Sequence, residues 1–258
     1  MKSILLTGAA SGIGRALALR LAIPSHSLHL GDLNQAGLED TAARCAQAGA
    51  TVTPRVVNVA DAAAMEAWIQ SCGTLDLVLG CAGVQYASLV GSPETAAETR
   101  KTIEINLLGA VNTTLPALDL MARQTPGPKG VRGQIALLAS QGAFVSVPGA
   151  PAYCASKAAV DNWTVGRAVT ARRQGIYMTS VCPGYVQTPM TTINDFPMHG
   201  LMTPDRAAEI ILQRLEKRPT RIAFPWRMYA AARLGGLLPA GFPARMLIRN
   251  FLRRGGTL

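Results

Sequence analysis

The chain has 258 residues, a length that suits one large α/β domain. Hydrophobic residues make up 49% of it and charged residues 16%, a composition that excludes a disordered chain, a collagen-like repeat and a coiled coil. The formal net charge is +10, and residues 206–258 carry +9 of it, from eleven Lys and Arg against two Glu, so residues 1–205 are nearly neutral.

Short β-rich apolar runs alternate with Ala-rich helical segments almost to the end of the chain. This alternation predicts repeated βα units around a parallel sheet. Strands are expected at residues 3–7, 27–31, 51–57, 75–80, 134–139, 176–182 and 221–224. Helices are expected at about residues 12–22, 35–48, 61–71, 96–121, 152–172 and 204–218. The predicted fold is a doubly wound α/β domain, a Rossmann fold with seven parallel strands in the order 3-2-1-4-5-6-7, over residues 1–225, followed by a helical extension over residues 226–258.

A cluster of glycines follows the first predicted strand and leads into a helix. The candidate residues for binding a phosphate group are Gly8, Ser11, Gly12, Ile13 and Gly14. Three glycines in this setting let the backbone turn sharply and approach a pyrophosphate, and the free N–H groups at the helix start stabilise its charge. The motif therefore predicts a dinucleotide site.

Asp32 stands eighteen residues after Gly14, at the end of the second predicted strand. An acid at about this offset hydrogen-bonds the adenine ribose, and its charge would repel a 2′-phosphate. Because Leu33 and Asn34 follow it rather than an arginine, the sequence favours NAD over NADP. The alternative is that Asp32 only caps the next helix.

Ser140, Tyr153 and Lys157 lie in and after the fifth predicted strand. Tyr153 and Lys157 are four residues apart, so on a helix they share one face. A tyrosine with an ordinary pKa of about 10 is a poor base at neutral pH. A nearby ammonium group would stabilise the phenolate, so we expect Lys157 to lower the pKa of Tyr153.

These motifs, with Pro183-Gly184 after the sixth strand, resemble the short-chain dehydrogenase/reductase family in order and spacing, over residues 1 to about 225. The resemblance implies that Tyr153 is the general acid/base and that Ser140 orients and polarises the substrate carbonyl. It implies that Lys157 tunes Tyr153 and holds the nicotinamide ribose. Asn106 is similar to the family's helix asparagine, which holds a water in the proton relay.

The resemblance also extends the cofactor site to residues after the third, fourth and sixth strands. These are Asn58, Val59, Ala82, Gly83, Pro183, Gly184, Val186 and Thr188. Three positions depart from the family pattern. Asn58 replaces an aspartate, and Gly80-Cys81 replaces two asparagines, so two amides that brace the central sheet are missing.

The sequence thus predicts an NAD-dependent oxidoreductase that interconverts a secondary alcohol and a ketone, with proton transfer at Tyr153. An apolar substrate is favoured by the Leu, Met, Phe and Pro content of residues 189–202. The alternative is a non-catalytic nucleotide-binding regulatory or scaffolding protein, although such a protein has no need of a proton donor. The resemblance further implies a homodimer or homotetramer through the helices that carry Asn106 and Tyr153.

Five cysteines without a CxxC pair indicate reduced thiols, and no apolar signal segment is seen, so we expect a cytoplasmic protein. The absence of an apolar run of about 18 residues argues against a spanning helix but leaves surface attachment open. His26, His29 and His199 share no metal-ligand spacing, so no metal is expected.

The predicted C-terminal extension is strongly basic, because from Pro219 onward the chain has seven arginines and no acid. Leucines and aromatic residues between the arginines fit amphipathic helices, and the sequence favours a lid over the substrate or a subunit interface as their role. The alternative is that these helices rest on an anionic membrane surface. No nucleic-acid partner is expected, because no recognition motif accompanies the charge.

Overall fold

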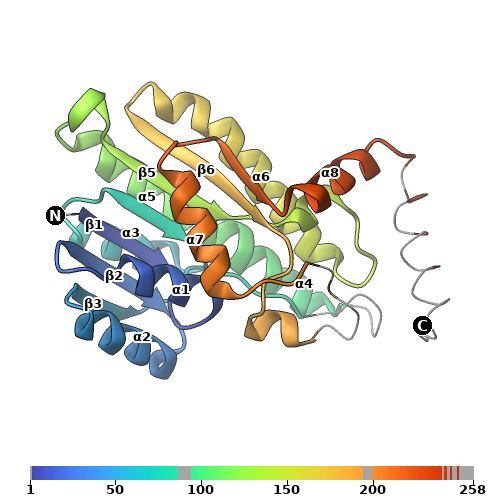
Figure 1. The fold of residues 1–258 in the computed structure, drawn as a ribbon, viewed down its shortest axis with the longest axis horizontal. Helices are drawn as coiled ribbons and strands as arrows, with labels where there is room; N and C mark the ends of the chain where they lie inside the picture. Colours follow the sequence, from blue (N-terminus) through green and yellow to red (C-terminus); the bar gives the residue numbers. More distant parts are fainter. Residues whose placement is uncertain are drawn as a thin grey trace.

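The protein is described here by a computed structural model, which covers residues 2–86, 94–193, 198, 200–239, 241, 242, 245 and 249. Seven parallel strands form one sheet in the order β3-β2-β1-β4-β5-β6-β7, as predicted (Figure 1). The strands are β1 (Lys2–Thr7), β2 (His26–Asp32), β3 (Thr51–Val56), β4 (Leu77–Gly80), β5 (Gly133–Leu138), β6 (Ile176–Pro183) and β7 (Arg221–Phe224).

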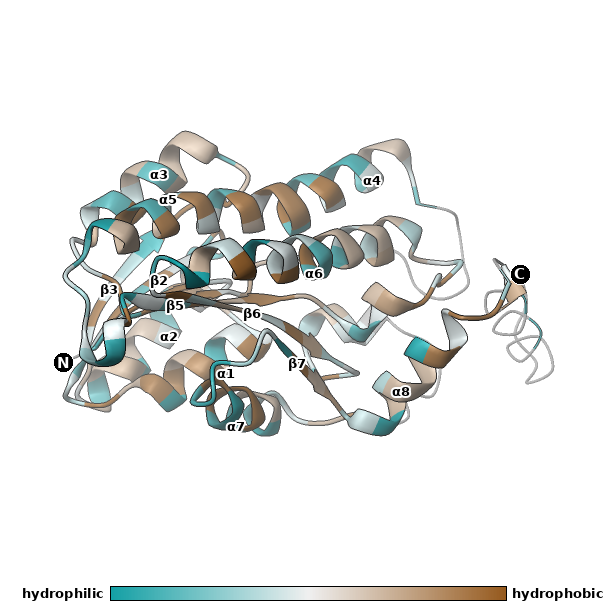
Figure 2. Ribbon diagram, turned by 90° about the horizontal axis from the view of Figure 1, so that it is seen from above, coloured by the Kyte–Doolittle hydropathy of each residue, from teal (hydrophilic) through white to brown (hydrophobic). Residues whose placement is uncertain are grey.

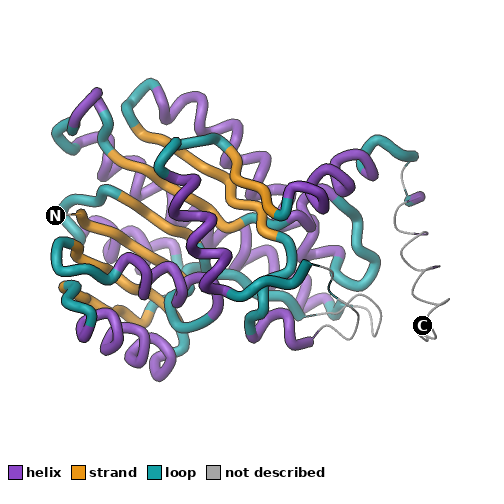
Figure 3. Tube along the Cα trace, viewed as in Figure 1, coloured by secondary structure: helices purple, strands orange, loops and turns teal. Residues whose placement is uncertain are grey.

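Helices connect the strands and cover both faces of the sheet (Figures 2 and 3). The α-helices are α1 (Gly12–Leu21), α2 (Gln35–Gln47), α3 (Ala62–Ser71), α4 (Ala96–Ile103), α5 (Gly109–Arg123), α6 (Pro151–Arg172), α7 (Pro204–Leu215) and α8 (Trp226–Gly235). Short helical turns are η1 (Glu104–Leu108), η2 (Pro128–Gly130), η3 (Gln141–Phe144) and η4 (Pro189–Ile193). None of these described helices is long and apolar enough to cross a lipid bilayer.

Two apolar cores lie on opposite faces of the sheet, because side chains of a strand alternate between its faces. On β1, Ile4 and Leu6 belong to the core under α1, α2 and α7, while Leu5 belongs to the core under α3, α5 and α6. All three are fully buried. Strands with both faces covered read as continuous apolar runs, which is why the sequence pattern marks the central strands so clearly.

The single helix expected over residues 96–121 is wrong in one respect, since the structure divides it into α4, the π-helical turn η1 and α5. A π-helical turn adds one residue to the helix, and hydrophobic periodicity does not reveal so small a shift. Close packing follows the turn, because a Cβ at Gly109 would lie 2.5 Å from the side chain of Val59. The bulge therefore accompanies a tight contact with the loop after β3.

The start of the predicted C-terminal extension coincides with α8, which begins at Trp226. This helix packs against η3, where the rings of Phe144 and Tyr229 meet edge to face at 5.2 Å. The residues beyond Gly235 that were expected to be helical lie mostly outside the described part of the chain, as does His199.

Candidate active site

A cleft of about 440 Å³ opens at the carboxyl ends of the strands. In an open parallel sheet the loops that follow these ends meet at one edge, where ligands bind. The cleft is lined by every residue predicted for the cofactor site, and by three of the four predicted catalytic residues, Ser140, Tyr153 and Lys157. Only Asn106 lies outside the lining.

The glycine loop between β1 and α1 forms one wall of the cleft. Gly8 and Gly12 have φ angles of +71° and +54°, a left-handed conformation that favours glycine. A Cβ at Gly14 would collide with the carbonyl oxygen of Gly8, so the loop requires glycine there as well. The geometry explains why these three positions carry no side chain.

The start of α1 suits an anionic group. Its first N–H groups have no acceptor within the helix, as at any helix N-terminus, and Ser11 at the N-cap makes no capping hydrogen bond with its side chain. The first turn of α1 contains no acidic residue. Unpaired donors without a competing carboxylate fit the pyrophosphate that the motif predicts.

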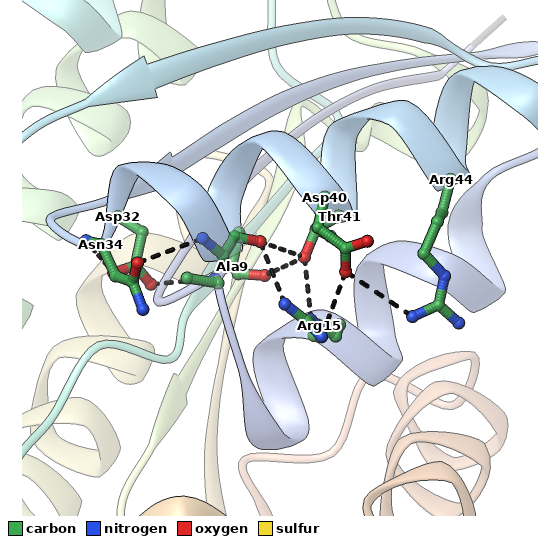
Figure 4. A network of polar contacts seen from close by, with 9 residues as sticks. Ala9, Arg15, Asp32, Asn34, Asp40, Thr41 and Arg44 are labelled. Carbon is green, nitrogen blue, oxygen red and sulfur yellow. Dashed lines mark hydrogen bonds and ion pairs between the residues drawn. The ribbon is translucent and has the colours of Figure 1, made fainter.

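Asp32 sits at the end of β2 and holds two backbone segments (Figure 4). Its Oδ2 accepts a hydrogen bond from the N–H of Ala10 at 2.9 Å, and its Oδ1 accepts one from the N–H of Asn34 at 2.9 Å. The carboxylate does not cap α2, because Asn34 is the N-cap and its Oδ1 accepts from the N–H of Gly37 at 3.1 Å. The capping role considered for Asp32 therefore belongs to Asn34.

Arg15 stands directly after the glycine loop, and its guanidinium is engaged by α2 (Figure 4). It donates to Thr41 Oγ1 at 3.0 Å and pairs with the carboxylate of Asp40 at 3.2 Å. Thr41 in turn donates to the carbonyl of Ala9 at 3.0 Å, which ties the glycine loop to α2. Arg15 does not line the cleft, so Lys157 is the only cation among the described lining residues.

Ser140 and Tyr153 line the same cleft as the glycine loop, and the Ser140 hydroxyl lies close enough to the Tyr153 phenol to influence its pKa. Ser140 follows β5 as the N-cap of η3, and its Oγ accepts from the N–H of Gly142 at 3.0 Å. Tyr153 comes from the first turn of α6, and Lys157 lies one turn later, as the spacing predicts. Lys157 Nζ lies 5.8 Å from the centre of the Tyr153 ring and donates to the carbonyl of Leu138 at 2.8 Å.

Burial is the largest influence on the pKa values of both Tyr153 and Lys157. It raises the pKa of Tyr153 to about 12, although the hydrogen bond with Ser140 acts in the opposite direction. Burial also lowers the pKa of Lys157 to about 8. The expected lowering of the Tyr153 pKa by Lys157 is therefore not seen in this structure, because burial is the largest influence and Lys157 is not among the groups that shift this pKa. The ammonium group donates to Leu138 instead.

Asn106 lies on η1 behind the cleft and is 1% exposed. Its Oδ1 accepts from the N–H of Val84 at 2.8 Å, while its Nδ2 donates to the carbonyl of Val84 and to Ser156 Oγ, both at 3.0 Å. The amide thus braces the loop after β4 against α6. Its role in a proton relay stays a prediction.

Two further residues of the lining were not singled out as functional by sequence reasoning. Thr191 Oγ1 donates to the carbonyls of Val186 and Thr188, each at 2.9 Å, and so holds the loop after β6. A threonine three residues after Thr188 is the available sequence signal, since Ser and Thr often close turns in this way. Cys81 also lines the cleft, and burial raises the pKa of its thiol to about 12. Among the described residues no cluster of His, Cys, Asp or Glu could hold a metal ion.

The chain is similar to known proteins over most of its length. A family model described as short chain dehydrogenase matches residues 2–195. An uncharacterized oxidoreductase of Myxococcus xanthus is 30% identical over 243 residues, which cover 92% of this chain and 93% of that protein. The 3-hydroxyacyl-CoA dehydrogenase type-2 of Drosophila melanogaster is 34% identical over 216 residues, covering 80% and 85%.

A solved structure shares the fold. The crystal structure of an actinorhodin polyketide ketoreductase variant with NADPH has a TM-score of 0.74 and 24% sequence identity, and the match covers 86% of this chain and 95% of that one.

Proposed function

Because the chain belongs to the short-chain dehydrogenase family and is one of its oxidoreductases, we propose that it interconverts a secondary alcohol and a ketone with NAD, using Tyr153 as general acid/base. The observation that carries the proposal is the Ser140–Tyr153 pair, which lines the same cleft as the glycine loop and Asp32. A site for binding alone has no need of a hydroxyl pair of this kind, which argues against a purely regulatory or scaffolding role.

The preference for NAD is supported by the charges at the adenine end of the cleft. The Asp32 carboxylate is held by two backbone N–H groups, so it cannot easily turn away from a ligand. A 2′-phosphate beside it would meet a like charge, and Arg15 is bound to α2 instead of facing the cleft. The dinucleotide would be held by the start of α1, by Asp32 and by the backbone after β4 and β6.

When bound, the nicotinamide ring donates or accepts the hydride. Tyr153 donates its phenolic proton to the carbonyl oxygen as that oxygen becomes a hydroxyl, and removes the proton in the reverse direction. Since its pKa is about 12, Tyr153 holds its proton at neutral pH, which suits reduction of a ketone. Ser140, fixed by the N–H of Gly142, positions the substrate oxygen beside the phenol.

The lining supports an apolar substrate. Val84, Leu138, Pro189 and Met190 contribute apolar side chains, and no described lining residue beyond Lys157 and Asp32 carries a charge. We also propose self-association through α5 and α6, where Leu115 and Val169 are exposed.

Turnover of Tyr153→Phe tests the proposal. NADH absorbance is followed with alcohols and ketones of increasing chain length, and NADH binding is followed by fluorescence titration. We expect turnover to fall by about 100-fold or more, with NADH affinity nearly unchanged. Tyr177→Phe, a change of the same size on β6 outside the cleft lining, serves as the control. Retained turnover in Tyr153→Phe would remove that residue from its role, and NADH binding without turnover of any substrate would favour the regulatory alternative.

A further inference from the structure

Exposed apolar side chains and arginines alternate over α8 and the described residues that follow it. We call this segment the C-terminal platform (226–239, 241, 242, 245 and 249). Its large apolar side chains are between 43% and 82% exposed; they are Trp226, Leu234, Leu237, Leu238 and Phe242. Its four arginines are all exposed; they are Arg227, Arg233, Arg245 and Arg249. Soluble proteins rarely expose so many large apolar side chains in so short a segment, so the platform is expected to bind a partner.

The charge of the platform is uncompensated. The last acidic residue of the chain is Glu216, so every charged side chain of the platform is an arginine. Within the described part of the chain, no platform arginine forms an ion pair. Arg233 instead lies over the ring of Phe144 at 5.4 Å. The partner that complements this surface is therefore both anionic and apolar.

The platform is fixed beside the active site. The ring of Tyr229 on α8 packs against Phe144 on η3, and Gln141 Nε2 donates to the carbonyl of Pro225 at 3.1 Å. Because η3 begins directly after Ser140, the platform is held by the loop that carries the catalytic serine. In Figures 1 and 3, α8 lies beyond β7, at the end of the molecule toward which the strands run.

A second hollow separates the platform from α6. It measures about 870 Å³ and is lined by Phe144, Val147, Leu237 and Leu238, with Arg233 at the side. Cys154, the neighbour of Tyr153, also faces it. Apolar walls with one guanidinium continue the chemistry of the platform toward the catalytic helix.

A lid or a twofold subunit interface fits the described residues of the extension less well than a lipid surface does. A lid would cover the cleft, but none of the described residues from Trp226 onward lines it. A twofold interface sets the same patch of both copies face to face, which would bring two acid-free cationic surfaces together. Like charges brought into a desolvated interface repel, and no acid of the platform relieves that repulsion.

We propose that the C-terminal platform docks the protein on an anionic lipid bilayer. Trp226 and the exposed leucines enter the headgroup region, where aromatic rings are favoured, and the arginines bind lipid phosphates. Docking in this way holds the cleft close to the bilayer, from which an apolar alcohol or ketone would enter. The inference does not depend on turnover, because binding to the bilayer is measured without substrate.

Co-sedimentation with vesicles tests the proposal, using phosphatidylcholine alone or with phosphatidylserine. We expect the full chain to bind only the anionic vesicles, and high salt to weaken that binding. The variant with Arg227, Arg245 and Arg249 all changed to Glu should bind at least about 100-fold more weakly, since each basic residue near the surface adds about fivefold. Tryptophan emission should shift to the blue on binding, and Trp226→Phe should abolish the shift, because Trp68 is buried and the half-buried Trp163 lies on α6, outside the platform.

A matched variant separates the platform from overall charge. Changing Arg55, Arg167 and Arg173 to Glu alters the net charge equally, and these exposed arginines lie outside the platform. This variant should keep most of the vesicle binding. An equal loss in both variants, no binding of the wild type at low salt, or tighter binding to a duplex oligonucleotide would overturn the proposal. The proposal would also be overturned if the chain formed a dimer that the platform substitutions abolish and did not bind vesicles. Circular dichroism verifies that each variant is folded.

Discussion

Replacing Arg221 with methionine leaves a buried carboxylate without its partner. Asp161 on α6 is 5% exposed, and its two oxygens accept from Arg221 Nε at 2.8 Å and Nη2 at 2.7 Å. Ser180 donates to the same carboxylate at 2.6 Å. Burial raises the pKa of Asp161, but the hydrogen bonds from Arg221 and Ser180 outweigh it and hold the pKa below its ordinary value. The pair thus joins α6 to the edge strand β7.

The stability that Arg221→Met should lose is estimated from the two hydrogen bonds between Arg221 and Asp161 and from the burial of the Asp161 carboxylate. Each bond to a charged group contributes about 1.5–3 kcal/mol, and breaking a buried pair costs about 3–5 kcal/mol. We therefore expect Arg221→Met to lower the free energy of unfolding by roughly 4 kcal/mol near neutral pH, or the melting temperature by roughly 10 °C. Urea denaturation monitored by circular dichroism measures the free energy of unfolding.

The pH dependence carries a definite sign. Because the folded-state pKa of Asp161 is depressed, its stabilisation is present above the unfolded pKa and is lost as the pH falls through the folded pKa. Without Arg221 the pKa of Asp161 in the folded protein rises. The free energy of unfolding of the variant should therefore fall furthest below that of the wild type at neutral pH, and the two values should approach each other at acid pH.

An exposed pair of the same geometry is the control. Arg20 binds Asp205 through two hydrogen bonds of 2.7 and 2.6 Å, but both side chains face solvent. Arg20→Met should leave the urea midpoint within experimental error. Equal losses in Arg221→Met and Arg20→Met would refute the reasoning from burial, as would a loss that does not change with pH.

Three further predictions concern the cleft. Gly14→Ala should cost about 1–3 kcal/mol of stability and weaken NADH binding, because its Cβ collides with Gly8, whereas Gly166→Ala, with open space around it, should be neutral or stabilising in the same melts. Lys157 has a pKa of about 8 in the folded protein against 10.5 unfolded, so below pH 8 the buried charge destabilises the wild type and Lys157→Met should be more stable by roughly 3 kcal/mol. This advantage should disappear as the pH rises from about 8 to 10.5. Free energies of unfolding in urea that differ by the same amount at every pH would contradict the prediction. Asp32→Asn should bring the affinity for NADPH about tenfold closer to that for NADH in fluorescence titrations, and an unchanged ratio would exclude charge as the cause.

The fold and the lining of the cleft could be predicted from local pattern, because parallel strands bring their carboxyl ends to one edge. The glycine loop begins directly after β1, Asp32 ends β2 and Ser140 comes two residues after β5, so knowing the strands was enough to place these residues together. Tyr153 and Lys157 needed only the helical spacing of four.

Other features depended on contacts between distant segments. Asn106 takes a bracing position because a π-helical turn and the loop after β4 meet there, and a one-residue bulge leaves no periodic signal. Asp161 and Arg221 are sixty residues apart, and nothing in either segment marks them as partners. The direction of the Tyr153 pKa also escaped prediction, because the spacing of Lys157 says nothing of how deeply both groups are buried.

The sequence by itself determined which chemical groups this protein carries and at which edge of the sheet they gather, since the alternation of strands and helices along the chain and the spacing within a helix are local properties. Only the tertiary structure decided how those groups are solvated and bonded, because desolvation and hydrogen bonding depend on the atoms that distant segments bring around each side chain. The arginines of α8 illustrate the division: their charge follows from the sequence, but their exposure beside the loop that carries Ser140 exists only in the folded molecule.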